Sequence, residues 1–215
     1  DGGWDGQFYG SDGRSVTYTS ASHFQLTTGS GNDTLATADG NDSVNSGAGD
    51  DLVDVGSGVD NADGGDGADR ISANLAAAAT AVYWNLSANS YSGPGGFTNF
   101  EYFGTITTGI GNDVIVSGSG SRNETVNTGS GGDTVTVFGG GDTANLGAGD
   151  DLLIIDWSDI GSSVYNSSGP SVNGSDGGWD GQFYGSDGRS VTYTSANRFD
   201  VTSGSGNDTI ATAGG

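Results

Sequence analysis

Acidic side chains recur about every nine residues in this chain, and this spacing is the feature that could do chemistry. The acidic positions are Asp33, Asp42, Asp51, Asp60 and Asp69 in a first block, Asp113, Glu124, Asp133, Asp142 and Asp151 in a second, and Asp208 in a third. Because the chain has no cysteine and one histidine, its metal ligands must be carboxylate and backbone carbonyl oxygens. All-oxygen ligands on flexible turns favour Ca²⁺ over Zn²⁺ or copper, and Mg²⁺ is the weaker competitor because it needs a tighter octahedron.

Glycine follows the same register. In the unit GSGNDTLAT, which begins at Gly29, the first and third residues are glycine, the fifth is acidic and the seventh is apolar. A turn of this kind needs glycine because its backbone visits positive φ. We therefore expect the following glycines to shape the metal-binding turns: Gly29, Gly31, Gly40, Gly47, Gly49, Gly58, Gly65, Gly67, Gly109, Gly111, Gly129, Gly131, Gly140, Gly147 and Gly149.

The elements that position these turns are predicted to be very short strands. Each nonapeptide divides into a six-residue turn and a three-residue strand with one inward apolar side chain. That column reads Leu35, Val44, Val53, Ala62 and Ile71 in the first block, and Ile115, Val126, Val135, Ala144 and Leu153 in the second. One small apolar side chain cannot offset the entropy of ordering nine residues, so the repeats must stack. The predicted fold is all-β, a parallel β-roll in two blocks.

Two nonapeptides complete one coil of such a roll, so residues 18 apart stack on each other. The stacked carboxylate pairs are 33/51, 42/60, 51/69, 113/133, 124/142 and 133/151, and a cation between the members of each pair would replace repulsion by attraction. Six Ca²⁺ would change the formal charge from −22 to −10. A two-residue insertion at Arg122–Asn123 precedes Glu124, so we expect the site at Glu124 to be weak, distorted or empty.

Composition limits the partners and the chemistry. With 27 acidic and 5 basic residues the chain repels nucleic acid and anionic membranes. The sequence contains no apolar run of about 18 residues, so it predicts no membrane-spanning helix. The only histidine, His23, corresponds to Arg198 in a later copy of the same sequence, and no catalytic motif accompanies it. We therefore predict a module that is not an enzyme.

A second repeat is much longer. Residues 176–195 are identical to residues 1–20, and over the forty residues from 176 to 215 only seven differ from residues 1–40, so the period is 175 residues. We expect the parent protein to carry several such units as neighbours. The expected segments are a linker or cap at 1–28, a first calcium roll at 29–73, an interrupting β-rich segment at 74–108, a second calcium roll at 109–156, a linker or cap at 157–203 and the start of another roll at 204–215.

The linker segments are predicted to contain strands as well. Residues 7–19 are typical of a hairpin around Ser11, Asp12 and Gly13. Residues 82–86 and 97–103 alternate like strands, with a turn at 92–96. The aromatic residues Trp4, Phe8, Tyr9 and Tyr18 either cap the open end of a roll or form a ligand-binding face.

The nonapeptides resemble the hemolysin-type calcium-binding repeats of the RTX family. The family pattern G-G-x-G-x-D-x-U-x matches from its second position onward, whereas its first glycine is kept at Gly64 and replaced at Thr28, Thr37, Ser46, Val55 and Thr108. The resemblance implies a parallel β-roll with Ca²⁺ in its turns, export by type I secretion, and folding outside the cell or at the cell surface.

The long repeat favours a structural role, in a protein such as an adhesin, a surface-layer protein or a fibre. Two alternatives stay open. One is a calcium-dependent module that binds a carbohydrate, ice or a partner surface. The other is a roll that assists the export and folding of a secreted hydrolase or toxin.

Overall fold

The computed structural model describes residues 3–9, 15–166, 171–172 and 177–211, and these residues form strands and turns without a helix. The strands are β1 (Trp4–Tyr9), β2 (Ser15–Ala21), β3 (Gln25–Thr27), β4 (Thr34–Ala36), β5 (Ser43–Asn45), β6 (Leu52–Ser57), β7 (Asn61–Asp63), β8 (Arg70–Asn74), β9 (Tyr83–Asn85), β10 (Ser90–Ser92) and β11 (Gly96–Thr98). They continue as β12 (Tyr102–Thr107), β13 (Val114–Val116), β14 (Thr125–Asn127), β15 (Thr134–Val137), β16 (Gly141–Asn145), β17 (Leu152–Asp156), β18 (Val164–Asn166), β19 (Ser171–Val172), β20 (Trp179–Gly185), β21 (Ser190–Ala196) and β22 (Arg198–Thr202).

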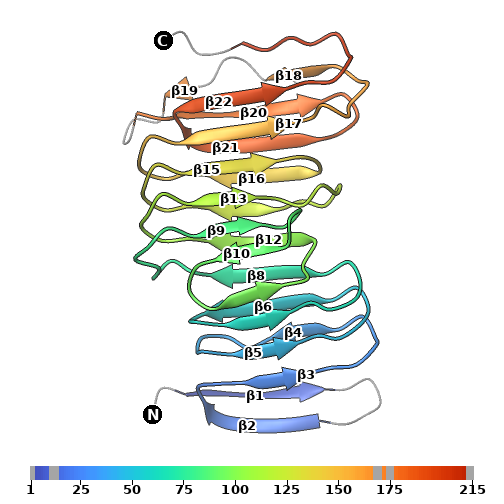
Figure 1. Cartoon of the computed structure of the whole chain (residues 1–215), viewed down its shortest axis with the longest axis vertical. Helices are drawn as coiled ribbons and strands as arrows, with labels where there is room; N and C mark the ends of the chain where they lie inside the picture. Colours follow the sequence, from blue (N-terminus) through green and yellow to red (C-terminus); the bar gives the residue numbers. More distant parts are fainter. Residues whose placement is uncertain (1–2, 10–14, 167–170, 173–176, 212–215) are drawn as a thin grey trace.

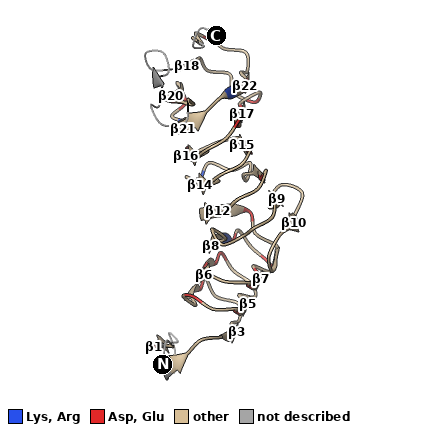
Figure 2. Cartoon of the chain, turned by 90° about the vertical axis from the view of Figure 1, so that its left-hand side faces the viewer, with Lys and Arg blue, Asp and Glu red and all other residues tan. Residues whose placement is uncertain are grey.

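The strands form a tall, two-layered stack (Figure 1). One layer is a ten-stranded sheet in the order β18-β20-β21-β16-β14-β12-β8-β6-β4, with β19 paired to β20. The other layer consists of a four-stranded sheet, β11-β7-β5-β3, and a six-stranded sheet, β10-β9-β13-β15-β17-β22. Figure 2 shows the two layers from the side. The predicted all-β parallel roll is therefore confirmed.

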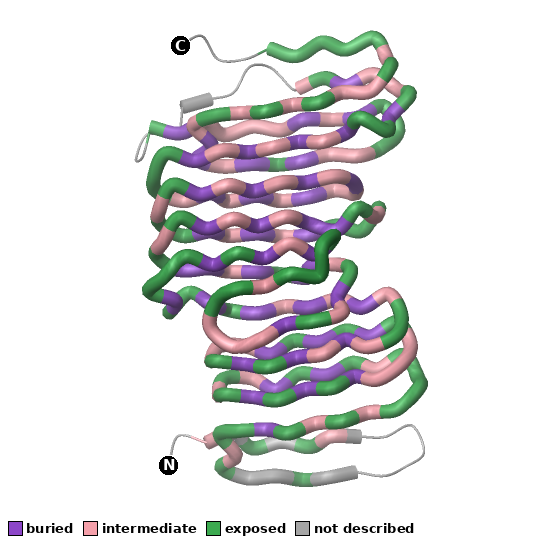
Figure 3. Tube along the Cα trace, viewed as in Figure 1, coloured by how far each residue is buried: buried purple, intermediate pink, exposed green. Residues whose placement is uncertain are grey.

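One coil takes two nonapeptides, as the spacing predicts. Strand β4 pairs in parallel with β6, with Leu35 opposite Val53, and β5 pairs in parallel with β7, with Val44 opposite Ala62. The apolar residue of each short repeat strand is buried between exposed or half-buried neighbours, and Figure 3 shows this alternation along the stack. The buried side chains of both layers form one core cluster, so the stacking supplies the burial that a single repeat lacks.

The segment at 74–108 continues the stack. Strand β12 lies between β8 and β14, so the ten-stranded sheet passes from the first block of repeats into the second without a break. Trp84 on β9 stacks on Phe97 on β11 with ring centroids 4.5 Å apart and fills the core there. The strand predicted at 82–86 is present as β9. The stretch predicted as a strand at 97–103 is instead divided between the end of β11 and the start of β12, with a break at residues 99–101. The residues at 92–96, however, do not join hairpin partners, because β10 turns back on β9 and β11 pairs with β7.

A β-hairpin lies near each end of the described chain. The hairpin predicted at residues 7–19 is formed by β1 and β2, and its turn at Ser11–Gly13 lies outside the described residues. The identical sequence near the other end forms the hairpin of β20 and β21. None of the described residues belongs to a helix that could cross a membrane.

Candidate metal sites

The acidic residues of the repeats lie directly before the short strands, except for Asp142, which is the second residue of β16. Figure 2 faces the turns on one edge of the stack and shows acidic residues in them. Each predicted pair is linked in the same way, because the backbone N–H of one acidic residue donates to a carboxylate oxygen of its partner in the next coil. For example, Asp42 N–H donates to Asp60 Oδ1 at 2.8 Å. The other linked pairs are 33/51, 51/69, 113/133 and 133/151 at 2.8 Å, and 124/142 at 3.0 Å.

The second oxygen of most of these carboxylates is buried without a hydrogen-bond partner among the described residues. These oxygens are Oδ2 of Asp42, Asp51, Asp60, Asp69 and Asp133, and Oε2 of Glu124. A buried carboxylate is costly unless a cation or a donor meets it. These orphaned oxygens, which belong to residues nine apart within each block, therefore mark places where a cation would fit.

The glycines complete an oxygen-lined turn. Gly58 has a φ of +156°, and a Cβ added to it would lie 1.5 Å from Gly40 O and 3.1 Å from Asp60 Oδ1. A carbonyl oxygen of one coil and the carboxylate of the next thus lie against a position where only glycine fits. Gly131 repeats the arrangement, with Gly111 O at 1.6 Å and Asp133 Oδ1 at 3.1 Å from an added Cβ.

Most of the predicted glycines share this conformation. A positive φ occurs at Gly40, Gly47, Gly49, Gly58, Gly65, Gly67, Gly111, Gly129, Gly131, Gly140, Gly147 and Gly149, and not at Gly29, Gly31 or Gly109. An added Cβ at Gly29 or Gly31 would touch nothing, because no described coil packs beneath them. Gly109 is crowded instead by the carbonyl oxygens of Ala76 and Ala78.

The ligand chemistry is that of a hard cation. No three His, Cys, Asp or Glu side chains come together as a metal cluster in the described part of the chain. A site built here therefore combines one or two carboxylates with backbone carbonyl oxygens. This set suits Ca²⁺, which takes six to eight oxygen ligands in a flexible geometry.

Burial disfavours the ionised form of these carboxyl groups when no cation is near. Desolvation by burial raises the pKa of Asp60, of Asp69 and of Asp133 from 3.8 to about 6 in each case, although a backbone N–H from the neighbouring coil opposes the shift. The neighbouring acidic residues raise these pKa values further. The turns therefore hold carboxylates that need either a proton or a cation.

The turn at Glu124 differs from the others. Glu124 Oε1 accepts two N–H groups, from Phe103 at 2.7 Å and from Gly118 at 3.3 Å. The Arg70 guanidinium donates to the carbonyl oxygens of Phe103 and Asn123 at 3.0 and 2.7 Å, so these two oxygens already have a cationic partner. The prediction of a weak site at Glu124 stays a prediction, and Arg70 gives it a physical reason.

Asp208 lies at the start of the third block. Its Oδ1 accepts the N–H of Val164 at 2.8 Å, which is the same kind of link as in the earlier turns. Its pKa lies below the ordinary value, because the hydroxyl of Ser203 and this N–H both donate to the carboxylate.

Two residues outside the predicted set continue these ladders. Glu101 Oε2 accepts the N–H of Asp69 at 2.9 Å, and Asn197 Oδ1 accepts the N–H of Asp151 at 3.0 Å. Both take the position that an aspartate holds in a regular coil. Neither residue lies in the nine-residue register, so the repeat pattern could not predict their position in the ladders.

The residues that replace the first glycine of the family pattern also have a role. All of them except Val55 have a hydroxyl group, which donates to a carbonyl oxygen of the next coil, as Thr28 Oγ1 does to Ser46 O at 2.7 Å and Ser46 Oγ does to Gly64 O at 2.8 Å. Thr108 and Thr128 make the same contact in the second block. This hydroxyl ladder stabilises the stack where the family pattern has glycine.

Comparisons with known proteins agree with this geometry. The family model for the RTX calcium-binding nonapeptide repeat matches four copies, at residues 27–62, 54–75, 105–122 and 119–153. The curated proteins and the solved structures gave no match to the chain.

Proposed function

Because this chain belongs, through its repeats, to the RTX calcium-binding nonapeptide family, we propose that it is a structural unit of a large secreted or cell-surface protein that folds and stiffens on binding Ca²⁺. RTX repeats are calcium-binding structural elements and not catalytic ones. The finer proposal is that the module catalyses nothing itself, that it acts outside the cell, and that its parent is an adhesin, a surface-layer protein or a fibre.

The orphaned carboxylate oxygens carry the proposal. We assign the cations to the six linked pairs, with about six Ca²⁺ per chain, ligated by the paired carboxylates and by glycine carbonyl oxygens of the turns. Asp208 would begin a further ladder in the third block. At a formal charge of −22 the chain repels itself, so bound Ca²⁺ supplies both local ligation and overall neutralisation.

The long duplication supports a structural role over a binding role. A 175-residue unit that is copied nearly unchanged is typical of proteins that gain length from repetition. The turn asparagines are exposed, but their side-chain oxygens already bind backbone N–H groups of the roll itself. Asn32, Asn41 and Asn112 each accept a backbone N–H of the next coil at 2.9 Å.

Far-UV circular dichroism during calcium titration from EDTA tests this function. We expect a cooperative gain of β signal between about 10⁻⁴ and 10⁻³ M Ca²⁺ and little response to Mg²⁺, because binding and folding are coupled in such a roll. A spectrum that EDTA and calcium leave unchanged, together with no bound calcium by mass spectrometry, would overturn the proposal.

A further inference from the structure

Residues 1–28 and their copy 176–203 are here called the joint segments, and the residues that the structure describes in both of them form the same elements. Both hairpins have a bulge at the same place, between Trp4 and Gly6 in one and between Trp179 and Gly181 in the other. The ring centroids of Phe8 and Phe24 lie 5.8 Å apart. Those of the matching pair, Phe183 and Phe199, lie 5.9 Å apart.

The backbone at the end of each hairpin agrees as well. Ser20 and Ser195 both have a positive φ, of 52° and 62°. Their N–H groups donate to the matching carboxylates, Asp5 Oδ1 at 2.6 Å and Asp180 Oδ1 at 2.9 Å. The fold of a joint segment is thus set by its own sequence.

The surroundings of the two joint segments differ. Strand β21 lies in parallel against β16, from Ser190 opposite Gly141 to Thr194 opposite Asn145, and Tyr193 is buried there in the common core. Strands β1 and β2 form a two-stranded sheet of their own among the described residues. In Figure 1, β2 is the outermost strand at its end of the stack, with the edge that corresponds to the docked edge of β21 facing outward.

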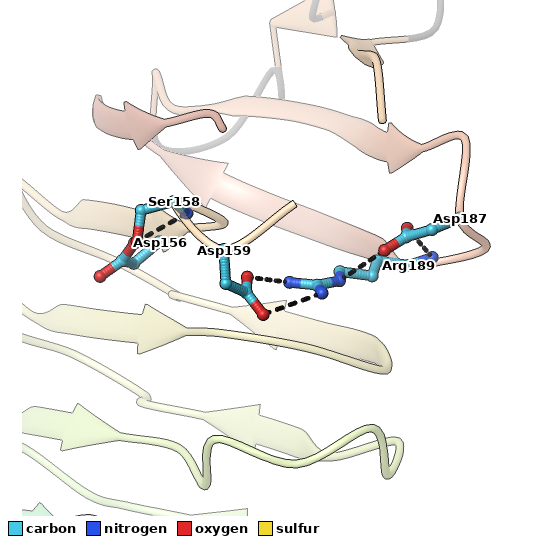
Figure 4. Close-up of polar contacts among 5 residues, drawn as sticks. All are labelled: Asp156, Ser158, Asp159, Asp187 and Arg189. Atoms are coloured by element: carbon cyan, nitrogen blue, oxygen red, sulfur yellow. Dashed lines mark hydrogen bonds and ion pairs between the residues drawn. The ribbon is translucent and has the colours of Figure 1, made fainter. Parts of the chain in front are cut away.

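An ion pair fastens the docked hairpin. Arg189, in the turn between β20 and β21, donates to both carboxylate oxygens of Asp159, at 2.6 and 3.1 Å, and Asp159 lies in the loop after β17 (Figure 4). The same guanidinium also contacts Asp187 at 2.9 Å. This pairing raises the pKa of Arg189 and lowers that of Asp159. Arg14 holds the matching position in the other joint segment and lies outside the described residues.

The strand after each hairpin is β3 in one copy and β22 in the other. Each of these two strands is paired along one of its edges, and the paired edge of β3 is the opposite edge to that of β22. Strand β22 pairs with β17 of the roll that precedes it, with Val201 opposite Ile155. The matching strand β3 pairs with β5 of the roll that follows it, with Leu26 opposite Val44. Leu26 and Val201 are equivalent positions of the 175-residue repeat. The same strand can therefore pair with the last strand of one roll along one edge and with the first strand of the next roll along its other edge.

The ten-stranded sheet is also continued across the joint. Tyr165 on β18 forms a parallel bridge with Thr209, and Thr209 N–H donates to Val164 O at 2.8 Å. Thr209 is the copy of Thr34, which begins β4, and β4 is the edge strand of the ten-stranded sheet. A preceding unit would therefore present its own β18 to this edge.

From these contacts we infer that the joint segment fuses consecutive 175-residue units end to end into one unbroken roll. Its hairpin docks on the second roll of the preceding unit, and its last strand is shared by both rolls. The partner of residues 1–28 is thus the C-terminal end of another copy of residues 109–166. This inference rests on the proposed tandem structural function and adds the geometry of assembly.

Four of the seven differences between the copies, at positions 22, 23, 25 and 26, fall on or directly before the strand that pairs with β17, and two of them change side-chain contacts with the preceding roll. Arg198 pairs with Asp150 at 3.1 Å and Asn197 accepts the N–H of Asp151, whereas the other copy has His23 and Ser22 at these positions. A joint made by residues 1–28 therefore lacks these two contacts and depends on strand pairing, and Tyr18 and Arg14 are the sequence equivalents of Tyr193 and Arg189.

The test extends the chain by its own period, with residues 1–175 placed before the full chain in one polypeptide. Asp156→Cys in the first unit and Thr27→Cys in the second put a single cysteine pair across the inner joint, because the chain has no other cysteine. Asp156→Cys with Thr202→Cys in the single chain is the reference, since Asp156 and Thr202 are register partners there. In saturating calcium we expect both disulfides to form to the same extent, because neighbouring strands have a suitable Cα separation.

Small-angle X-ray scattering of the same two-unit protein without cysteines provides the second readout. We expect one rigid rod, and we expect Tyr18→Ala in the second unit to make it flexible, whereas Tyr18→Ala in the first unit leaves the rod straight. The inference is wrong if circular dichroism shows that calcium folds both units while the disulfide fails to form and the scattering shows two hinged bodies. That outcome would leave the calcium-dependent structural function intact.

Discussion

The two edges of the second roll, residues 109–156, hold their acidic residues in different ways. On one edge Asp113, Asp133 and Asp151 precede β13, β15 and β17, and the Oδ1 atoms of Asp133 and Asp151 each accept an N–H from the preceding acidic residue at 2.8 Å. On the other edge Glu124 precedes β14 and Asp142 is the second residue of β16, and their link is 3.0 Å long. A regular nine-residue spacing thus gives a regular ladder, whereas the insertion before Glu124 gives a carboxylate that protein donors already hold.

The charges on the two edges differ accordingly. Burial raises the pKa of Glu124 from 4.5 to about 7 and that of Asp142 from 3.8 to about 8, and the Glu124 charge adds to the shift of Asp142. The pKa of Asp133 rises only to about 6. Arg70 lowers the pKa of Glu124, which shows that a protein cation lies within reach of this carboxylate. We therefore expect the Asp113–Asp133–Asp151 edge to bind Ca²⁺ more tightly than the Glu124–Asp142 edge.

The largest difference between the edges should come from Asp133→Asn. Asp133 belongs to two linked pairs, so its loss removes a ligand from two cation sites, whereas Asp142→Asn affects one weak site. At calcium a hundredfold above the Kd each lost site costs about 2.7 kcal/mol, so the expected loss is about 5 kcal/mol for Asp133→Asn and much less for Asp142→Asn. Urea unfolding in saturating calcium measures both, and equal losses would contradict the comparison.

A somewhat smaller effect is expected for Gly131→Ala. The φ of +148° and the contact with Gly111 O leave no room for a methyl group, so the cost should be about 2–4 kcal/mol. Gly132→Ala is the matched control, because its nearest contact would be an ordinary 3.4 Å. Thermal unfolding in calcium checks the pair. A Gly132→Ala protein as unstable as Gly131→Ala would show that the turn geometry is not the cause.

When calcium is absent, the pH dependence of folding stability should be dominated by the Glu124–Asp142 edge, whose pKa values are raised most. The folded-state pKa values lie above their ordinary values, so the fold binds these protons more tightly than the unfolded chain does. Their contribution is fully present below about pH 4 and is lost as the pH rises through about 6 for Asp133 and through about 7–8 for Glu124 and Asp142. In EDTA, the β signal in circular dichroism should therefore be larger at pH 5 than at pH 8. A signal that grows with pH would contradict this sign.

The smallest expected effect is that of Glu124→Gln in saturating calcium. The amide keeps the size of the side chain and an acceptor for Phe103 N–H, and it removes a buried charge that Arg70 already partly balances. The calcium midpoint should change less than twofold, whereas in EDTA at pH 8 the variant should be more stable than the parent. A tenfold rise of the midpoint would show that Glu124 is a strong calcium ligand.

The repeats made much of the fold predictable. A local nine-residue pattern sets each turn and each inward side chain, so the spacing and the resemblance to RTX repeats together predict the parallel roll and the coil of 18 residues, as the pairing of Leu35 with Val53 illustrates. The linked carboxylate pairs follow from the same register.

The rest depends on contacts between residues far apart in sequence. Glu101 accepts the N–H of Asp69, which lies 32 residues away in the sequence. Strand β11 pairs with β7 within one sheet because Phe97 fills the core beside Trp84. The docking of β21 on β16 likewise rests on tertiary packing of Tyr193. No periodic signal encodes such contacts, so the sequence alone did not predict them.

The number of bound calcium ions tests the central claim most directly. Native mass spectrometry in calcium should count about six Ca²⁺ in the parent protein and about two fewer in Asp51→Asn, because Asp51 is linked to both Asp33 and Asp69. Asp54→Asn, an exposed strand position outside the ladders, should keep the parent count. Equal counts in all three proteins would contradict the assignment of calcium to the stacked carboxylates.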